Sequence, residues 1–293
     1  MNNEHESCLI CGSKKLKPLP VYSATYLVRC SNCKFVFSKR IPTEQELSEN
    51  YAHYSRSDYI SELTIKRYNE LLDRFEPFRK LNRILDVGSG VGHFLQTAKG
   101  RNWEVYGTEY TDVAIKKCEA KGIKMFKGPI SDSPFENNFF DVITSFEVLE
   151  HINTPNPEIE KFKSLLRGGG IVYLTTPNFN SISRYLMKEK YNVIEYPEHL
   201  SYYTPKTIHN LFTRHGFSKE SLQTTGFSVT RYKTSMKLAE SAYIGPTTDD
   251  EAIRKAMEKN SLMKFAKSAI NFLLSVTGKG DSLKIIYKVK KKQ

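Results

Sequence analysis

Two pairs of cysteines in this sequence have the spacing of metal ligands. Each pair has two residues between its members, and eighteen residues separate the pairs, at Cys8, Cys11, Cys30 and Cys33. This spacing is typical of a tetrahedral four-cysteine zinc site. Because thiolates fill all four positions and leave none for water, the pattern predicts a structural Zn²⁺ in a small zinc ribbon over residues 1–40.

A glycine-rich turn is the second group of residues that could bind a ligand. An apolar run over residues 84–87 leads into glycines at positions 88, 90 and 92, and helical periodicity resumes at Phe94. Glycines let the backbone approach a ligand, and a helix start offers unpaired N–H groups. Glu109 follows the next expected strand, roughly 20 residues on, where one carboxylate can bind both hydroxyls of a ribose. We therefore expect a compact polar ligand at this turn.

A third group combines carboxylates with imidazoles. Glu147, Glu150 and His151 form the pattern E-x-x-E-H, and His199 lies downstream in the segment Glu198-His199-Leu200. His151 can act as a general base. The two glutamates can equally form a solvated helix start, where the helix dipole favours negative charge, and His199 can simply line a pocket. Both interpretations stay open on the residues alone.

The elements that must position these groups alternate between strands and helices. Strands are expected over residues 84–87, 103–108, 123–126, 139–146 and 171–175. Between them we expect a helix over 112–120, a second helix that closes at 162–166, and a glycine turn at 168–170. This order predicts a parallel sheet with helices on both faces, whose ligands bind at the carboxyl ends of the strands.

Further segments flank this core. The sequence divides into the zinc ribbon (1–40), a helical arm that covers the cofactor site (41–82), a core (83–226), a helical insertion (227–277) and a closing strand with a basic tail (278–293). The arm begins with a capping box at Thr43 and Glu46. A strand is expected near 220–225, and residues 283–289 can pair beside it in the antiparallel direction.

The insertion contains an amphipathic segment. Its apolar face comprises Leu262, Phe265, Ala266, Ala269, Ile270 and Leu273. Lys264 and Lys267 lie off this face, as in a basic amphipathic helix. Docking on the domain or on a second subunit is favoured over peripheral membrane contact.

The composition of the chain indicates its cellular compartment and the classes of partner that it could bind. The chain has 293 residues, and its net charge is +12, of which residues 181–293 carry +10. A basic surface suits a phosphorylated substrate, an anionic membrane or a nucleic acid. The sequence lacks an apolar signal region and any run of roughly 18 apolar residues that could span a bilayer. We therefore expect a cytoplasmic protein, and paired cysteines fit metal binding in a reducing compartment.

The glycine turn with Asp86 before it has the form G-x-G-x-G and resembles motif I of the class I S-adenosylmethionine (SAM)-dependent methyltransferases. This resemblance implies a Rossmann-like α/β fold with seven strands, the last one antiparallel. It implies that SAM is bound by Asp86, Gly88, Ser89, Gly90, Gly92, Glu109, Ile130, Ser131 and Phe146. Pro129 stands where the family usually has an acidic residue, so adenine recognition falls to backbone groups, to Ser131 or to Asp132.

The pattern E-x-x-E-H with the downstream histidine resembles the ubiquinone-pathway O-methyltransferases and the small-RNA 2′-O-methyltransferases. The resemblance implies a divalent ion held by Glu147, Glu150, His151 and His199. Carboxylates and imidazoles suit Mg²⁺, Mn²⁺ or Zn²⁺. Catalytic roles then fall to His151, Glu147 and His199. A metal-free base at His151 and purely structural roles remain as alternatives.

Together with the cysteine pairs, the segments LDVGSGVGHF, FDVITSFEVLEHI, LLRGGGIVYLTTPN and EHLSYYTP resemble bacterial methyltransferases of cell-surface polysaccharide and nucleotide-sugar pathways. This resemblance implies O-methylation of a hydroxyl on a small-molecule or nucleotide-linked sugar. A zinc-ribbon rRNA or tRNA methyltransferase is an alternative, but the ribbon carries little of the positive charge and no N-P-P-Y signature is present. A non-catalytic binding module is disfavoured because the glycines and Glu109 are intact. The oligomeric state is not indicated.

Overall fold

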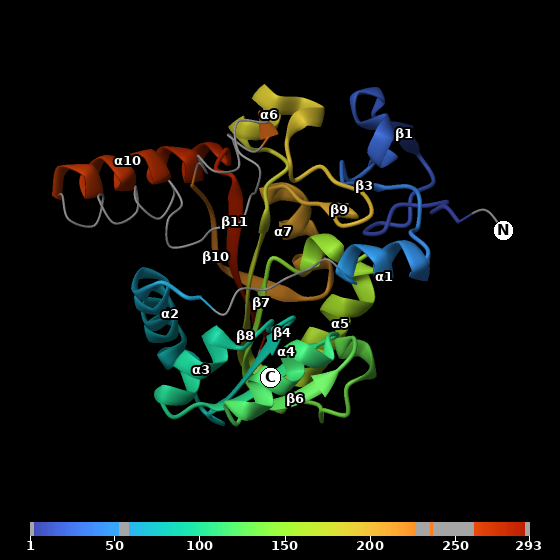
Figure 1. The fold of residues 1–293 in the computed structure, drawn as a ribbon. Helices are drawn as coiled ribbons and strands as arrows, with labels where there is room; N and C mark the ends of the chain where they lie inside the picture. The colour runs from blue at the N-terminus through green and yellow to red at the C-terminus, as the bar shows by residue number, and fades with distance from the viewer. Residues whose placement is uncertain (1–2, 53–58, 227–234, 237–260, 291–293) are drawn as a thin grey trace.

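The computed structural model describes residues 3–52, 59–226, 235–236 and 261–290, with a seven-stranded sheet at its centre (Figure 1). The strands are β4 (Arg83–Val87), β5 (Glu104–Glu109), β6 (Lys124–Lys127), β7 (Phe140–Phe146), β8 (Leu166–Pro177), β10 (Phe217–Thr225) and β11 (Ser282–Val289). They run in the order β10-β11-β8-β7-β4-β5-β6. Strands β4 to β8 are parallel, whereas β11 is antiparallel to both of its neighbours. The predicted Rossmann-like sheet with an antiparallel last strand is confirmed.

Helices cover both faces of this sheet. They are α2 (Glu62–Phe75), α3 (His93–Gly100), α4 (Asp112–Ala120), α5 (Pro155–Leu165) and α7 (Pro205–Arg214). Successive side chains of a strand point to opposite faces. Accordingly, Ile84 of β4 packs in a buried cluster with α2, α3 and α4, whereas Leu85 packs in a second cluster with α5 and α7. The helix expected over residues 112–120 has these bounds in the structure.

The glycine turn expected at 168–170 lies within the bounds of β8, as a bulge. Helix α5 ends at Leu165 and β8 begins at Leu166. Its pairing with β7 passes from Phe140–Leu166 to Val142–Ile171, so residues 167–170 lie opposite a single residue, and Gly169 has a φ of 82°. A Cβ added to Gly170 would come within 2.9 Å of the carbonyl oxygen of Asp141 in β7. The glycine is needed because two backbones approach closely inside the sheet.

The cysteine pairs lie in a small second sheet. It comprises β1 (Leu16–Pro18), β2 (Leu27–Cys30), β3 (Val36–Ser38) and β9 (Ser201–Tyr202), all antiparallel and in this order. The 3-10 turn η1 (Pro20–Thr25) connects β1 to β2. Figure 1 shows β9, which comes from far along the chain, beside the N-terminal strands. The zinc ribbon is therefore continuous with a strand that the sequence analysis did not anticipate.

The helical arm contains α1 (Glu44–Ala52) and α2, and a 3-10 turn, η2 (Glu76–Phe78), follows it. The predicted capping box is present. The Glu46 N–H donates to Thr43 Oγ1 over 3.2 Å, and the Thr43 N–H donates to Glu46 Oε2 over 2.8 Å. Helix α1 is thus capped as its sequence predicts.

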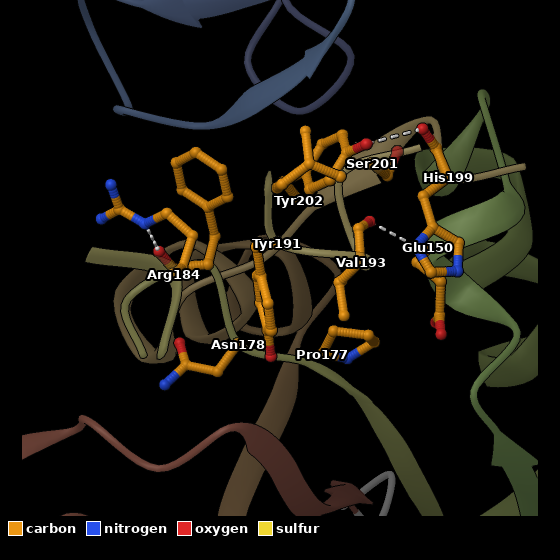
Figure 2. Close-up of a pocket in the computed structure, with 11 residues that line it drawn as sticks. Glu150, Pro177, Asn178, Arg184, Tyr191, Val193, His199, Ser201 and Tyr202 are labelled. Carbon is orange, nitrogen blue, oxygen red and sulfur yellow. Dashed lines mark hydrogen bonds between the residues drawn. The ribbon is translucent and has the colours of Figure 1, made fainter. Parts of the chain in front are cut away.

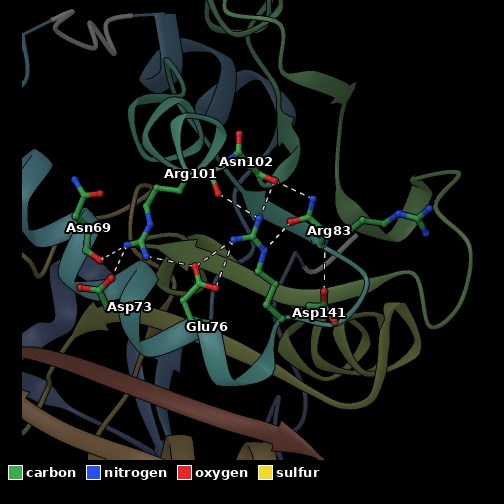
Figure 3. Close-up of polar contacts among 9 residues, drawn as sticks. Asn69, Asp73, Glu76, Arg83, Arg101, Asn102 and Asp141 are labelled. Atoms are coloured by element: carbon green, nitrogen blue, oxygen red, sulfur yellow. Dashed lines mark hydrogen bonds and ion pairs between the residues drawn. The ribbon is translucent and has the colours of Figure 1, made fainter.

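Hydrogen bonds and ion pairs of two arginines hold α2 against the core (Figure 3). Arg101 donates to the carbonyl oxygen of Asn69 over 2.8 Å and forms ion pairs with Asp73 (2.7 Å) and Glu76 (3.3 Å). Arg79 pairs with Glu76 at 3.2 Å and donates to the carbonyl oxygen of Arg101. These contacts join the arm to the connection between α3 and β5.

Near the C-terminus, α10 (Ser261–Thr277) projects from the sheet, and α6 (Ile182–Met187) with the turn η5 (Lys188–Lys190) lies near its C-terminal end (Figure 1). Thr224 and Asn271 tie α10 to the end of β10. Phe265 is 72% exposed and Leu273 is 62% exposed, so these two members of the predicted apolar face do not dock on the domain. The rest of the predicted insertion, residues 227–234 and 237–260, lies outside the described residues. Among the described helices, none is long and apolar enough to cross a membrane.

Candidate active site

The glycine turn lies at the carboxyl end of β4, directly before α3. Gly88, Gly90 and Gly92 all have positive φ, at 69°, 57° and 77°. A Cβ at Gly88 would lie 2.6 Å from a methyl group of Val148, and one at Gly92 would lie 2.8 Å from the sulfur of Cys118. Conformation and space thus both exclude a side chain at Gly88 and at Gly92.

Two buried carboxylates accompany this turn. Glu109, the last residue of β5, is 5% exposed and accepts hydrogen bonds from the N–H groups of Gly90 (2.9 Å) and Tyr110 (3.0 Å). Asp86 in β4 is buried and accepts a hydrogen bond from Thr144 Oγ1 over 2.7 Å. The carboxylate of Glu109 therefore faces the glycine turn, as a group that binds ribose must.

The other residues assigned to the cofactor follow neighbouring strands. Ile130 is buried in the turn η3 (Ile130–Asp132) after β6, and Ser131 Oγ donates to Asp132 Oδ1 over 2.8 Å. Phe146 ends β7, and Ser89 begins the turn after Gly88 with its N–H bonded to the carbonyl of Thr108. All of them lie at the same edge of the sheet as Glu109.

Tyr68 of α2 was not named in the sequence analysis, but its side chain packs beside the glycine turn. Its ring centroid lies 5.3 Å from that of Phe94 and 6.1 Å from that of Phe146. Burial, with a smaller contribution from the charge of Asp86, raises the pKa of Tyr68 to about 12. The position falls at helical spacing with the buried Leu71, Leu72 and Phe75, a pattern that could have identified it.

A second group of side chains gathers after β7, in the 3-10 turn η4 (Leu149–His151). The ligand atoms of Glu150, His151 and His199 all lie within 4.8 Å of one another. Glu150 is 2% exposed and accepts a hydrogen bond from Thr176 Oγ1 over 2.9 Å. The structure thus brings together three of the four residues that the resemblance implied as ligands.

Both imidazoles are oriented by backbone carbonyl groups. Nδ1 of His151 lies 2.8 Å from the carbonyl oxygen of Glu198, and Nδ1 of His199 lies 2.6 Å from that of Val193. Because a carbonyl oxygen only accepts, each Nδ1 carries the proton, and the neutral ring has its lone pair on Nε2. The ring centroids are 4.9 Å apart. This tautomer is the one that a metal ligand or a general base with Nε2 requires.

Glu147 lies outside this group. Its φ is +51°, and the turn η4 begins only at Leu149, so Glu147 and Glu150 do not share a helical face. The interpretation of the two glutamates as a solvated helix start is wrong for Glu150, which is buried. The four-ligand set is therefore not assembled in this structure.

A small cavity adjoins the histidine cluster (Figure 2). Its volume of about 10 Å³ has room for a single water. Glu150 and His199 lie at one end of the residues that line it and Arg184 at the other. Arg184 donates from Nε to the carbonyl oxygen of Phe179 over 2.8 Å and lies over the ring of Tyr185. That arginine therefore packs the segment after β8.

The four cysteines form the other candidate metal centre. The sulfurs of Cys8 and Cys33 are 3.4 Å apart, and those of Cys11 and Cys30 are 3.6 Å apart. A tetrahedron with Zn–S bonds of about 2.3 Å has edges of about 3.8 Å, so the sulfurs fit zinc. The hydrogen bond between Cys8 and Cys33 lowers the pKa of Cys33 to about 5 and raises that of Cys8. The fifth cysteine, Cys118, is buried away from this cluster in α4.

Comparisons with known proteins agree with this geometry. A family model described as a methyltransferase domain matches residues 53–222. A ubiquinone biosynthesis O-methyltransferase of Roseobacter denitrificans is 29% identical over 160 residues, which cover 53% of this chain and 62% of that protein. One from Actinobacillus pleuropneumoniae serotype 7 is 33% identical over 107 residues, which cover 33% of this chain and 46% of that protein. The matches thus span about half of the length of these relatives.

Solved structures have the same fold. A SAM-dependent methyltransferase from Archaeoglobus fulgidus superposes with a TM-score of 0.53 at 20% identity, covering 84% of this chain and 100% of that one. A structure described as a putative sarcosine dimethylglycine methyltransferase from Galdieria sulphuraria also has a TM-score of 0.53, at 15% identity, with 78% and 86% covered. At these identities the likeness concerns the fold.

Proposed function

The chain belongs to the methyltransferase-domain family, and we propose that it transfers the methyl group of SAM to a hydroxyl oxygen. The residues of the glycine turn fit this cofactor, because Gly88, Gly90 and Gly92 present bare backbone in a left-handed conformation and Glu109 faces the turn with a buried carboxylate. When bound, SAM supplies a methyl group on a positively charged sulfur, and the S–CH₃ bond breaks as the oxygen bonds to carbon.

The orientation of His151 and His199 is the observation that carries this proposal. An alcohol must lose its proton as its oxygen attacks, and an imidazole with its lone pair on Nε2 can accept that proton. The carbonyl groups of Glu198 and Val193 hold each ring in this tautomer. The cluster follows β7, at the edge of the sheet where Glu109 and the glycine turn also lie. This common edge supports the proposal that the base acting on the acceptor belongs to the histidine cluster.

A divalent ion at Glu150, His151 and His199 is the finer form of the proposal. With Glu147 outside the group, two nitrogens and one carboxylate remain, a donor set that suits Mn²⁺ or Zn²⁺ better than Mg²⁺. When bound, such an ion lowers the pKa of a coordinated hydroxyl. In the metal-free alternative, His151 alone accepts the proton.

For the acceptor we propose a sugar or a nucleotide-linked sugar. Neighbouring hydroxyls of a sugar can approach one ion together, and the relatives named above are O-methyltransferases by name. The +10 charge of residues 181–293 suits a phosphate on the acceptor. The same charge suits RNA, so an RNA acceptor is the second candidate, and retention on RNA that weakens with salt would favour it.

Calorimetric titration tests the proposal. SAM and S-adenosylhomocysteine are titrated into protein without added metal and with Mn²⁺, and metal content is measured on the same samples. We expect SAM to bind, and one Mn²⁺ to bind in addition to zinc. The His199→Ala variant should lose the Mn²⁺, whereas His209→Ala, a histidine of α7 bonded to Tyr287, should keep it. Failure of SAM to bind under every condition would overturn the enzymatic assignment.

A further inference from the structure

Leu200 connects the zinc ribbon to the histidine cluster. Its carbonyl oxygen accepts a hydrogen bond from the N–H of Ser38, the last residue of β3, over 2.9 Å. Its own N–H donates to the carbonyl oxygen of Glu150 over 2.8 Å. Leu200 also follows His199 directly. One peptide segment therefore links the ribbon to the backbone of Glu150 and to His199.

Side chains around β9 strengthen this bridge. Ser201 Oγ donates to the carbonyl oxygen of Ile152 over 2.7 Å, and the Tyr202 hydroxyl donates to that of His199 over 3.0 Å. The ring centroid of Tyr203 lies 5.1 Å from that of Phe35. Phe35 is buried, and in the sequence it lies between Cys33 and the start of β3. The chain on both sides of His199 and His151 is thus held by contacts that begin in the ribbon.

The second cysteine pair fixes the strand to which this bridge attaches. The N–H of Cys30 donates to the carbonyl oxygen of Phe35 over 2.8 Å, and Lys34 donates back to Cys30 over 3.0 Å. Strand β3 begins at Val36, three residues after Cys33, and pairs with β9 at Val36–Tyr202 and Phe37–Ser201. Zinc at the thiolates constrains this turn and hence the start of β3.

The cofactor turn has further supports. Leu85 and Val87 of β4 pack in one buried cluster with Cys8 and Cys30, but strand pairing and helix α3 hold the turn independently of the ribbon. Strand β4 pairs with β5 and β7, and β5 pairs with β4 and β6. The helix that follows the turn, α3, packs in the buried cluster on the opposite face of the sheet from α5 and the ribbon. Loss of order in the ribbon would therefore reach the histidines before it reaches Gly88 and Glu109.

We propose that the zinc ribbon positions the imidazoles of His151 and His199 through β9, so that occupancy of the four-cysteine site controls acceptor activation and leaves cofactor binding intact. This inference rests on the proposed function, because it concerns regulation of the same histidine cluster. The ribbon would then contribute to the reaction, because removal of its zinc would stop deprotonation of the acceptor while SAM stays bound.

Exchange of the imidazole N–H protons tests the inference without any need for activity or a second metal. The chain has seven histidines, which selective ¹⁵N labelling resolves and single substitutions assign. An Nδ1–H bonded to a carbonyl oxygen exchanges slowly. In zinc-loaded protein we expect slow exchange at His151 and His199. After chelation, exchange should accelerate at least tenfold at both. The ¹⁵N signals of His209, whose Nδ1 is hydrogen-bonded to the Tyr287 hydroxyl, serve as the internal control and should not shift.

Two variant pairs separate the bridge from general instability. Cys33→Ser should reproduce the effect of chelation, whereas Lys14→Ala, at an exposed position of the ribbon, should retain zinc and leave the exchange slow. Tyr203→Ala removes the contact with Phe35 but leaves the cysteines, so it should accelerate exchange with zinc still bound, and Tyr203→Phe should not. S-adenosylhomocysteine should bind to every variant within about threefold of the wild-type affinity.

Two results would overturn the inference. One is unchanged exchange at His151 and His199 after zinc is removed. The other is a comparable change in the ¹⁵N signals of His209, which would indicate loss of structure throughout the domain. Neither result bears on the proposed function, which fails separately if SAM does not bind to the zinc-loaded protein. Conversely, absence of Mn²⁺ binding would reject the divalent ion without affecting the exchange measurement.

Discussion

The amide N–H of Gly90 donates a hydrogen bond to a carboxylate oxygen of Glu109 over 2.9 Å, which joins the ends of two neighbouring parallel strands. The contact places a buried negative charge against a turn whose three glycines have left-handed backbone conformations. A ribose brought to this turn meets a carboxylate that is already oriented, so little ordering is left to the moment of binding.

Replacing Glu109 should therefore weaken cofactor binding. Hydrogen bonds to a charged group contribute about 1.5–3 kcal/mol each, so Glu109→Ala should raise the dissociation constant of S-adenosylhomocysteine by at least about tenfold. Calorimetry measures this. Glu104→Gln is the matched control. Glu104 begins β5, at the end of the strand opposite to Glu109, and forms ion pairs with Arg83 and Lys124. Equal affinities of Glu109→Ala and wild type would reject the ribose assignment.

A side chain at Gly88 should destabilise the fold as well as block the turn. Its φ of 69° costs a non-glycine residue about 1–2 kcal/mol, and the added methyl group would meet Val148. We expect Gly88→Ala to lower the free energy of unfolding in urea by at least this amount. Gly100→Ala at the end of α3 has open space, and its effect should be within about 1 kcal/mol of zero. Similar values for the two variants would contradict the strain argument.

Glu158 in α5 should make stability depend on pH. Burial raises the pKa of Glu158 to about 7 from its ordinary value of 4.5. The folded state then holds a proton that the unfolded state releases, so stability is full below about pH 4.5 and falls as pH rises to about 7. The loss is about 3 kcal/mol.

Urea unfolding at pH 5 and pH 8 measures this dependence. Glu158→Gln should remove most of it and should be more stable than wild type at pH 8. Glu119→Gln, at an exposed position of α4, should retain the wild-type dependence. A wild-type protein whose stability does not fall over this range would show that Glu158 is ionised when folded.

Arg101 should hold the arm on the core more strongly than an exposed ion pair would. It is only 26% exposed and contacts Asn69, Asp73 and Glu76 together. In Arg101→Ala we expect backbone amide exchange in α2 to accelerate at least tenfold. Lys127→Ala, which breaks an exposed pair with Asp112, should change stability by less than about 1 kcal/mol. Undisturbed exchange in α2 would mean that apolar packing of Leu72 and Phe75 suffices.

Much of the core could be predicted from local patterns. The glycine turn, the strand that ends at Glu109 and the capping box at Thr43 depend on residues close together in the chain, whose spacing reports their conformation directly. The four cysteines also belong to this class, because ligand spacing within each pair is a local property. The parallel sheet with helices on both faces followed from the alternation of strand and helix patterns, whereas the order of the strands within the sheet came from the structure.

Local patterns misled where a contact between distant segments decided the structure. The glycines before residue 171 predicted a turn ahead of a strand, whereas the pairing of Leu166 with Phe140 makes this turn a bulge inside β8. Likewise, Glu147 and Glu150 have helical spacing, but the chain takes a left-handed conformation at Glu147 and then a 3-10 turn. A periodic pattern of residues does not report where two backbone segments that are distant in the sequence approach each other.

The sequence by itself determined which side chains can do chemistry: the four thiols, the carboxylate of Glu109 and the two histidines. Only the tertiary structure decided that His151 and His199 meet, that backbone carbonyl groups choose their tautomers, and that β9 joins the ribbon to both. The physical reason is that strand pairing and carbonyl hydrogen bonds use backbone groups, which are the same in every residue and so leave no mark in the sequence.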